Sequence, residues 1–520
     1  MVETKCIHVD RAQAAALNNP NQQLNLDHWR ALSDLHRTLL HEHHDFLLAS
    51  QHPSASPALR HLAVKYTIPA RMWKHGIHRF LELLRQKYEH ARRHNLDKVA
   101  RDTKELLLAF IFLVYQMIAL LYETVPAFED NWLECLGDLS RYRWAIEDDD
   151  MRDRETWANV ARSWYSKASD KNPPVGRLYH HLAILAQPNA LQQIYYYGRS
   201  LNSVEPFPSA RESVMTLFRG PLEREVSNGA SPLPVESCFV EAHAFAFARG
   251  SANRFESSSQ DYLSQLDDHI GRVTAKWKEQ GVYTAVTNIS GWFDYGVNSN
   301  PLRQLFRLRA EVREKPDYIV QPIDPDIPLE KQDPQRPMFT EEALLPMLKA
   351  NEKDLTFCRS TKLTNDTFAL VLRRIGDKNV LPHVHVMLSF LATFAAIGPI
   401  SHLIDPVPWA DVVDFLNTLI KTENQQRQGS SINESLAQPV FPAEGEKRAE
   451  DDLPLPEDWL IRGLIWEEKY LPANWFSKEF DEDDRYLELA STSRRRSIRI
   501  LRLGRQVSSV RSPPESCTTN

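Results

Sequence analysis

Glycine is scarce in this chain: 17 of 520 residues are glycine, about half of the usual share of roughly 7%. Few glycines allow few tight turns, which argues against a β-rich fold. The sequence also lacks the motifs G-x-x-x-x-G-K-[ST], G-x-G-x-x-G and G-x-S-x-G, so it offers no phosphate loop and no nucleophile elbow. These absences predict long helices, and the 32 prolines can lie in the connections between them.

Cysteine is also scarce and shows no metal-binding pattern. The five cysteines are scattered, at Cys6, Cys135, Cys238, Cys358 and Cys517. An odd count without a signal sequence is typical of a reducing compartment, so we expect a protein of the nucleus and cytoplasm. The HEHHD segment at His41 resembles a zinc-protease helix, but Asp45 stands where the second histidine ligand is needed. We expect no metal ion, no cofactor and no catalytic residue.

Charge and hydropathy argue against a protein with an overall basic surface for nucleic acid and against a membrane-spanning protein. The formal net charge of -7 provides no overall basic field for non-specific binding of nucleic acid. The apolar run Leu106–Tyr122 is shorter than the roughly 20 residues that a membrane span needs, and Lys104, Glu105 and Glu123 bound it closely. We interpret it as the central helix of a bundle, buried all round, and expect no membrane partner.

Helical periodicity begins near Leu26 and continues through a helix that starts at Pro69. One face of this second helix is apolar, with Trp73, Ile77, Phe80, Leu84 and Tyr88. On a 100° wheel the opposite face carries a basic stripe of Arg71, Lys74, His78 and Arg85. The stripe indicates either an anion-binding groove or a solvated surface, and the sequence leaves both open.

A repeat-like pair of helices follows. Ala161, Tyr165, Ala168 and Pro173 keep the A-x3-F-x2-A-x4-P spacing of the second helix of a tetratricopeptide repeat, and the preceding LGDLSRY supplies a leucine-glycine pair for the first. On that first helix Arg143 falls on the apolar face and Arg141 on the opposite one. The predicted fold is all-α.

Composition divides the chain into five parts. Residues 1–25 are expected to be a flexible tail, 26–220 a helical repeat domain, 221–421 a helical extension, and 422–452 a polar linker. The last part, 453–520, is rich in aromatic residues and ends in the basic segment from Arg494. This segment predicts either a nuclear-localisation or nucleic-acid patch, or an exposed helix end.

The segment Glu123–Phe218 resembles the telomerase-activating ever-shorter-telomeres family, which includes the adaptors of nonsense-mediated mRNA decay. Weaker similarity covers IPARMWKHGIHRFLELLR, LPHVHVMLSFLATFAAI, PWADVVDFLNTL and LPEDWLIRGLIWEEKYLPANWF, the last as in members from filamentous fungi. The resemblance implies a 14-3-3-like domain of tetratricopeptide-related helical pairs, followed by a stacked α-helical extension that is the DNA/RNA-binding-type domain of the family.

The resemblance also implies a phosphoserine site. Arg141 matches the arginine that the family uses on phosphate, and Tyr142 stands beside it. Where decay adaptors can have a lysine one turn after WKH, this chain has His78, which is a departure from the pattern. Lys74 and Arg71 can compensate for the missing charge. The expected site is therefore Arg141, Tyr142, Lys74, His78 and Arg71.

Two functions follow from the resemblance. One is a non-enzymatic adaptor that binds a phosphorylated RNA helicase of mRNA surveillance and recruits decay machinery. The alternative is a telomerase-associated subunit that binds telomerase RNA or single-stranded telomeric DNA. Larger relatives add a PIN nuclease domain, but the last 70 residues lack the length and the spaced strands that a compact α/β nuclease needs, so no nuclease activity is expected.

Overall fold

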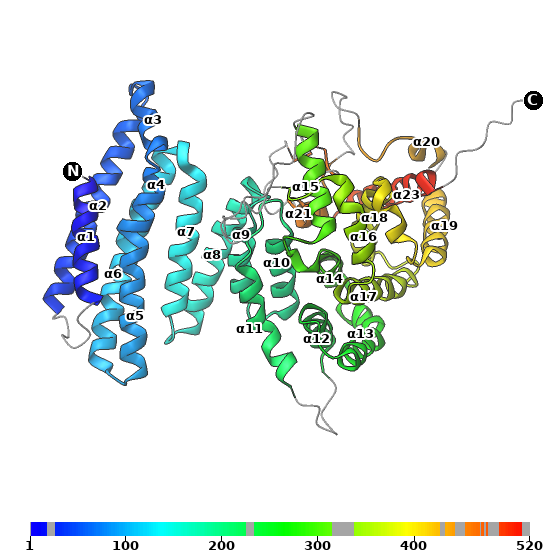
Figure 1. Ribbon diagram of the computed structural model, residues 1–520, viewed down its shortest axis with the longest axis horizontal. Helices are drawn as coiled ribbons and strands as arrows, with labels where there is room; N and C mark the ends of the chain where they lie inside the picture. Colours follow the sequence, from blue (N-terminus) through cyan, green and yellow to red (C-terminus); the bar gives the residue numbers. More distant parts are fainter. Residues whose placement is uncertain are drawn as a thin grey trace, which may run out of the picture. The chain divides into compact units, whose positions relative to one another are not determined.

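The computed structural model describes residues 2–17, 26–224, 233–314, 337–426, 432–442, 453–467, 470–472, 475–476 and 488–511 (Figure 1). Within these ranges the secondary structure is helical, and the only β interactions are two isolated bridges, Val175 with Glu205 and Ser203 with Leu464. The prediction of an all-α chain is confirmed. The chain divides into two compact units, Met1–Asn172 and Pro173–Asn520, so the predicted domain 26–220 extends over the first helices of the second unit.

Unit 1 is built from long helices that pack side by side (Figure 1). Its elements are α1 (Val2–Leu17), α2 (Leu26–Gln51), α3 (Pro57–Lys65), α4 (Ile68–Arg71), the π-helix η1 (Met72–His78), α5 (Arg79–Arg93), α6 (Asp97–Thr124), η2 (Pro126–Phe128), α7 (Glu129–Ile146) and α8 (Met151–Lys171).

The N-terminal segment corrects one prediction. Residues 1–25 were expected to be a flexible tail, but Val2–Leu17 forms helix α1, which packs on α2. Cys6 and Val9 are buried against Leu39, and Lys5 forms an ion pair with Glu42. The segment lacks a strong apolar period, so packing on α2 contributes to its helical state. Residues 18–25 lie outside the described ranges.

Helix α6 corrects a second prediction. It is long and apolar enough to cross a membrane, but only 39% of its apolar window is buried. One stripe of the helix, which includes Leu107, Val114 and Leu121, packs into the core of unit 1. The opposite stripe faces outward, with Phe112 65% and Leu120 49% exposed. The helix is thus central to the bundle but is not buried all round, because α2, α5 and α7 leave one side uncovered.

Helices α7 and α8 form the predicted helical pair. Ala161, Tyr165 and Ala168 are all buried, as the repeat spacing indicates. A Cβ atom on Gly137 would lie 2.7 Å from the Tyr165 ring, so glycine is needed where the two helices approach closely. Asp150 caps α8 by accepting hydrogen bonds from the backbone of Arg152 and Asp153. The prediction of tetratricopeptide-like helical pairs is confirmed.

Unit 2 stacks shorter helices around a larger core. Its elements are α9 (Gly176–Leu185), α10 (Ala190–Asn202), α11 (Ala210–Glu223), α12 (Val235–Phe247), α13 (Ala252–Val273), η3 (Thr274–Lys276), α14 (Trp277–Trp292), η4 (Asp294–Gly296), α15 (Pro301–Glu314), α16 (Glu341–Asn351), α17 (Leu355–Leu372), α18 (Leu381–Ala395), η6 (Gly398–Ile404), α19 (Trp409–Gln426), α20 (Ile432–Ala437), α21 (Pro456–Ile461) and α23 (Ala490–Arg511).

Aromatic rings fill the centre of this unit. Trp292 is fully enclosed and contacts the rings of Phe390 and Phe394 edge to face, while its Nε1 donates to Thr364 Oγ1 at 3.1 Å. His383 is buried and bonds Gly281 O at 2.8 Å. This histidine therefore belongs to the core of unit 2.

The basic C-terminal segment is an exposed helix end only in part, because Arg496 and Arg499 are buried in ion pairs. Arg496 on α23 forms ion pairs with Glu457 (2.6 Å) and Glu488 (2.5 Å), and only 1% of its side chain is exposed. Arg499, one turn later, pairs with Asp458 at 2.6 Å. The acidic pair of α21 and the arginines of α23 are far apart in sequence, so periodicity alone could not reveal that they neutralise one another.

The predicted linker 422–452 is described in part. Helix α19 continues to Gln426, and α20 occupies Ile432–Ala437. Arg502 and Arg505 of α23 bond the carbonyl oxygens of Ser435 and Leu436 at the C-terminal end of α20, where positive side chains are favoured. Residues 427–431 and 443–452 lie outside the described ranges.

Protonation of His36 is predicted to make unit 1 sensitive to acid. His36 is buried, stacks on Phe80 and bonds Gly76 O, and burial lowers its pKa from 6.5 to about 4. The unfolded chain takes up this proton at higher pH, so the free energy of unfolding should fall between pH 6.5 and 4, by about 3 kcal/mol for this group. In urea unfolding at pH 7 and 4.5, His36→Gln should lose less stability than wild type, whereas the exposed control His61→Gln should match wild type. Equal losses of stability in wild type and both variants would show that His36 is not the source of the acid sensitivity.

Removal of one member of the buried ion pair is predicted to destabilise unit 2. Arg496→Leu leaves the Glu457 carboxylate buried without its main counter-charge, which should cost about 3–5 kcal/mol. The double variant Arg496→Leu with Glu457→Leu should recover most of this loss, because no charge is then stranded. Arg494→Leu, an exposed change in the same helix, is the matched control and should change the free energy of unfolding little. A double variant no more stable than Arg496→Leu would argue against the pairing.

Candidate functional site

Arg141 lies on the side of α7 that is turned away from the apolar core, and it is engaged by neighbours of its own unit. Its Nη2 is 3.0 Å from Asp138 Oδ1, and its Nε donates to the Tyr165 hydroxyl at 3.2 Å. Tyr165 in turn donates to Asp138 Oδ1 at 2.6 Å. Burial opposes the charge, but Tyr165 and Asp138 raise the pKa of Arg141. The guanidinium is thus held in an internal ion pair, with 25% of the side chain exposed.

Tyr142 connects Arg141 to helix α5. Its ring lies 5.5 Å from the Arg141 guanidinium, and its hydroxyl donates to Glu82 Oε1 at 2.5 Å. Glu82 also pairs with Arg85 at 2.9 Å. Partial burial raises the pKa of Glu82, but the hydrogen bonds from Arg85 and Tyr142 outweigh this and hold the pKa below its usual value. The carboxylate beside Tyr142 is therefore charged at neutral pH.

His78 is the residue of the preceding segment that reaches this pair. It is exposed at the end of η1, and its ring centroid is 6.5 Å from that of Tyr142, in an edge-to-face arrangement. The structure therefore brings His78, Arg141 and Tyr142 together from two helices.

Arg71 lies on a different side of the segment. Burial lowers the pKa of His43 on α2, and the charge of Arg71 contributes to lowering it further. Burial lowers the pKa of His75, and the charge of the exposed Lys74 contributes to lowering it further. Met72–His78 is a π-helix with i→i+5 hydrogen bonds, so the 100° wheel that aligned Arg71 with His78 does not apply there.

The carboxylates beside the site, Asp138 and Glu82, were not predicted from the sequence. Asp138 stands three residues before Arg141, a spacing that signals an ion pair along a helix. Glu82 reaches Tyr142 only because α5 packs near α7, so no local pattern could have identified it. Arg85, expected in the basic stripe, is bound to Glu82 and Glu89 instead. Arg141 and Arg85 thus each have an acidic neighbour.

Comparison with known proteins identifies a domain that begins within α8. Residues 161–279 match the family described as the Est1 DNA/RNA binding domain. Over 86 residues, 16% of this chain and 5% of the relative, the sequence is 41% identical to telomerase-binding protein EST1A of Danio rerio. Over 196 residues, 36% of this chain and 15% of the relative, it is 26% identical to EST/SMG-like protein 2 of Saccharomyces cerevisiae.

A third relative is nonsense-mediated mRNA decay factor SMG7 of Arabidopsis thaliana, 38% identical over 85 residues, which are 16% of this chain and 8% of the relative. The matches thus span small parts of these longer proteins. The fold is similar to that in a crystal structure of Est1 and Cdc13, with a TM-score of 0.55 and 10% identity over 98% of this chain and 95% of that one. Residues 161–279 of this chain thus match an Est1 DNA/RNA binding domain, and parts of the chain are similar in sequence to EST1A, EST/SMG-like protein 2 and SMG7.

Proposed function

We propose that this chain is a non-enzymatic adaptor of mRNA surveillance that binds a phosphoserine of a phosphorylated RNA helicase and recruits decay machinery. The observation that carries this proposal is the placement of Arg141 and Tyr142 on α7 beside His78 of the segment that precedes α5. The homologous segment of a relative named as a decay factor supports it. Action in the nucleus and cytoplasm belongs to the same proposal.

Phosphate binding at this site requires an exchange of partners. A phosphoserine carries close to two negative charges at neutral pH, and the nearby carboxylates Asp138 and Glu82 repel it. Arg141 must therefore turn from Asp138 toward the phosphate, where charge-assisted and bidentate hydrogen bonds are stronger than neutral ones. Lys74 is exposed and adds a positive charge to the same segment. We expect selective but moderate affinity.

A telomerase-associated role is the second candidate. It is favoured by the match to a family described as DNA/RNA binding and by the relative named as telomerase-binding. In this role the chain would bind telomerase RNA or single-stranded telomeric DNA, again without catalysis.

Crosslinking in cells should separate the two roles. We expect immunoprecipitation of the chain after crosslinking to recover a phosphorylated RNA helicase, with little telomerase RNA. Treatment of the lysate with phosphatase before capture should remove the helicase, because the contact depends on the phosphate charge. Recovery of telomerase RNA without the helicase would instead support the second role.

Charge reversal at Arg141 is predicted to abolish selectivity for phosphate. A phosphoserine peptide should bind the full chain more tightly than its unphosphorylated twin, and Arg141→Glu should reduce that difference at least about tenfold, the loss expected for one charge-assisted bond. Fluorescence anisotropy of labelled peptides at fixed salt measures both affinities. Arg152→Glu, the same charge change at an exposed position of α8, is the matched control and should retain the selectivity.

A second variant tests the exchange itself. Asp138→Asn keeps an acceptor for Tyr165 but removes the charge that competes for Arg141, so it should raise the affinity for the phosphopeptide by about threefold or more. Equal binding of the two peptides to wild-type protein would reject the phosphoserine site.

A further inference from the structure

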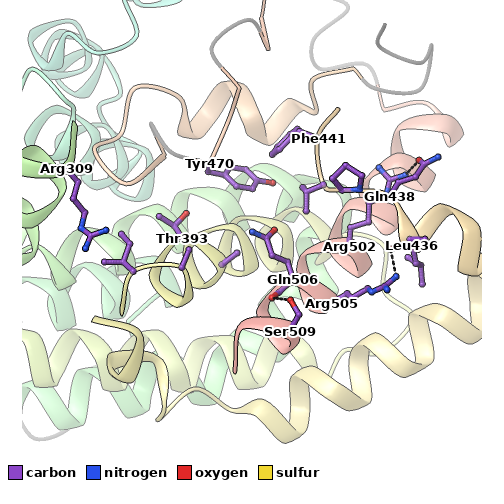
Figure 2. A pocket seen from close by; sticks show the side chains of 16 residues that line it. Arg309, Thr393, Leu436, Gln438, Phe441, Tyr470, Arg502, Arg505, Gln506 and Ser509 are labelled. Atoms are coloured by element: carbon purple, nitrogen blue, oxygen red, sulfur yellow. Dashed lines mark hydrogen bonds between the residues drawn. The ribbon is translucent and has the colours of Figure 1, made fainter. Parts of the chain in front are cut away.

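Unit 2 contains a pocket of about 810 Å³ that no part of the proposed function uses. Figure 2 shows its walls: the end of α18 with Thr393, the α20 segment with Leu436 and Phe441, the Tyr470 ring, and α23 with Arg502 and Arg505. Its volume lies within the range of roughly 300–1,000 Å³ that small-molecule sites occupy. The cavity is therefore large enough for a ligand with both a ring and a charged group.

The pocket is cationic in a chain of net charge -7. Among the described residues its lining includes Arg309, Arg502 and Arg505 and no aspartate or glutamate, although Arg309 pairs with Glu341 outside the lining. Two other cavities of the unit differ, because each is lined by residues of both charges: Asp377, Glu423, Lys378 and Arg494 in one, and Glu352, Asp366 and Lys362 in the other. An anionic ligand would therefore be attracted to this pocket specifically.

The arginines of α23 bond neutral acceptors at the mouth of the pocket. Arg505 is exposed, and its Nη1 donates to Leu436 O at 2.9 Å. Arg502 donates from Nε to Ser435 O at 2.8 Å and from Nη2 to Gln438 Oε1 at 2.6 Å. Since hydrogen bonds to charged oxygens are stronger than those to neutral ones, a phosphate can compete for these guanidinium groups. Arg502 and Arg505 are the predicted phosphate ligands.

An aromatic wall is fixed in place before any ligand arrives. The Tyr470 hydroxyl is 2.8 Å from His385 Nε2, and His385 Nδ1 is 2.9 Å from Glu457 Oε1, so two buried groups orient the ring. Phe441 packs edge to face against Tyr470 at 5.1 Å and against Trp475 at 4.9 Å. Rings held in this way provide a surface on which a nucleobase can stack.

Neutral polar side chains lie between the aromatic and the cationic walls. Figure 2 shows Gln506 extending from α23 toward Tyr470, with the Thr393 hydroxyl on the neighbouring wall. Together with Gln438 and Ser509 they supply donors and acceptors for a base edge or a sugar hydroxyl. An acidic peptide would use the arginines but would leave the fixed aromatic wall without a partner.

We propose that this pocket binds a nucleotide that carries a 5′-phosphate. The base stacks against the wall of Tyr470 and Phe441, and the phosphate binds Arg502 and Arg505. Such a nucleotide can be free in solution or form the 5′ end of a single strand, and the chemistry of recognition is the same. The site lies entirely in unit 2, outside residues 161–279, and is independent of the phosphoserine site around Arg141.

The test titrates the full chain by isothermal calorimetry with ADP, with a 5′-phosphorylated RNA pentamer and with its 5′-hydroxyl twin. ADP and the phosphorylated pentamer should bind, the latter at least about tenfold more tightly than its twin. Arg505→Ala should weaken both at least about tenfold. Ala396→Trp, at an exposed position that lines the pocket, should block both without removal of a charge. Arg494→Ala, an exposed arginine of the same helix outside this pocket, is the matched control and should bind as wild type.

Comparison of the two ligands identifies the source of the nucleotide. Tighter binding of the phosphorylated pentamer than of ADP assigns the pocket to strand ends, and the reverse assigns it to free nucleotides.

The proposal is overturned if neither ligand binds, if Ala396→Trp leaves binding intact, or if the two pentamers bind equally. It is also overturned if a pentaglutamate peptide displaces ADP at lower concentration than the phosphorylated pentamer does, since the site would then recognise acidic peptides. Because Arg141→Glu leaves this pocket unchanged, failure here and failure of the phosphoserine proposal are distinguishable.

Discussion

Arginine side chains removed from water hold the C-terminal part of this protein together, and their need for oxygen partners sets its geometry. Arg496 and Arg499 pair with the two carboxylates of α21, and one turn further along the same helix face Arg502 bonds the end of α20. A guanidinium buried without such partners would cost several kcal/mol, so α23 can occupy only the register that supplies them. That register then places Arg505 and Gln506 at the mouth of a cavity.

The oxygen partners of the arginines also distinguish the two candidate sites. Around Arg141 the partners are charged: Asp138 holds the guanidinium, and Glu82 lies beside Tyr142. A phosphate that binds there must displace the carboxylate of Asp138 from Arg141, and this competition limits the affinity for the phosphate. A phosphate with two negative charges competes better than a group with one. In the pocket of unit 2 the bonded partners of Arg505 and Arg502 include neutral carbonyl and amide oxygens, and no carboxylate is present among the described residues that line the cavity. An anion that binds Arg505 there competes with a neutral carbonyl oxygen, whereas at Arg141 it competes with the carboxylate of Asp138.

Much of the fold was predictable because helical periodicity is a local property of sequence. The buried face of α7 and the repeat spacing of Ala161, Tyr165 and Ala168 both follow from residues within a few turns of one another. Errors arose where packing overrides local pattern. Helix α1 depends on contacts with Leu39, and one stripe of α6 stays exposed because its neighbours cover only the other side.

The features of the candidate site also divide into those that the sequence predicts and those that only the tertiary structure reveals. The sequence by itself determined an all-α chain of paired helices, the outward position of Arg141 and the presence of Tyr142 beside it, because each depends on the turn of a single helix. Only the tertiary structure decided which charges meet. The π-helical turn that separates Arg71 from His78, the approach of Glu82 to Tyr142, and the burial of Arg496 against Glu457 all join residues that no local period relates. Electrostatic energy depends on distance through space, whereas periodicity reports only distance along the chain.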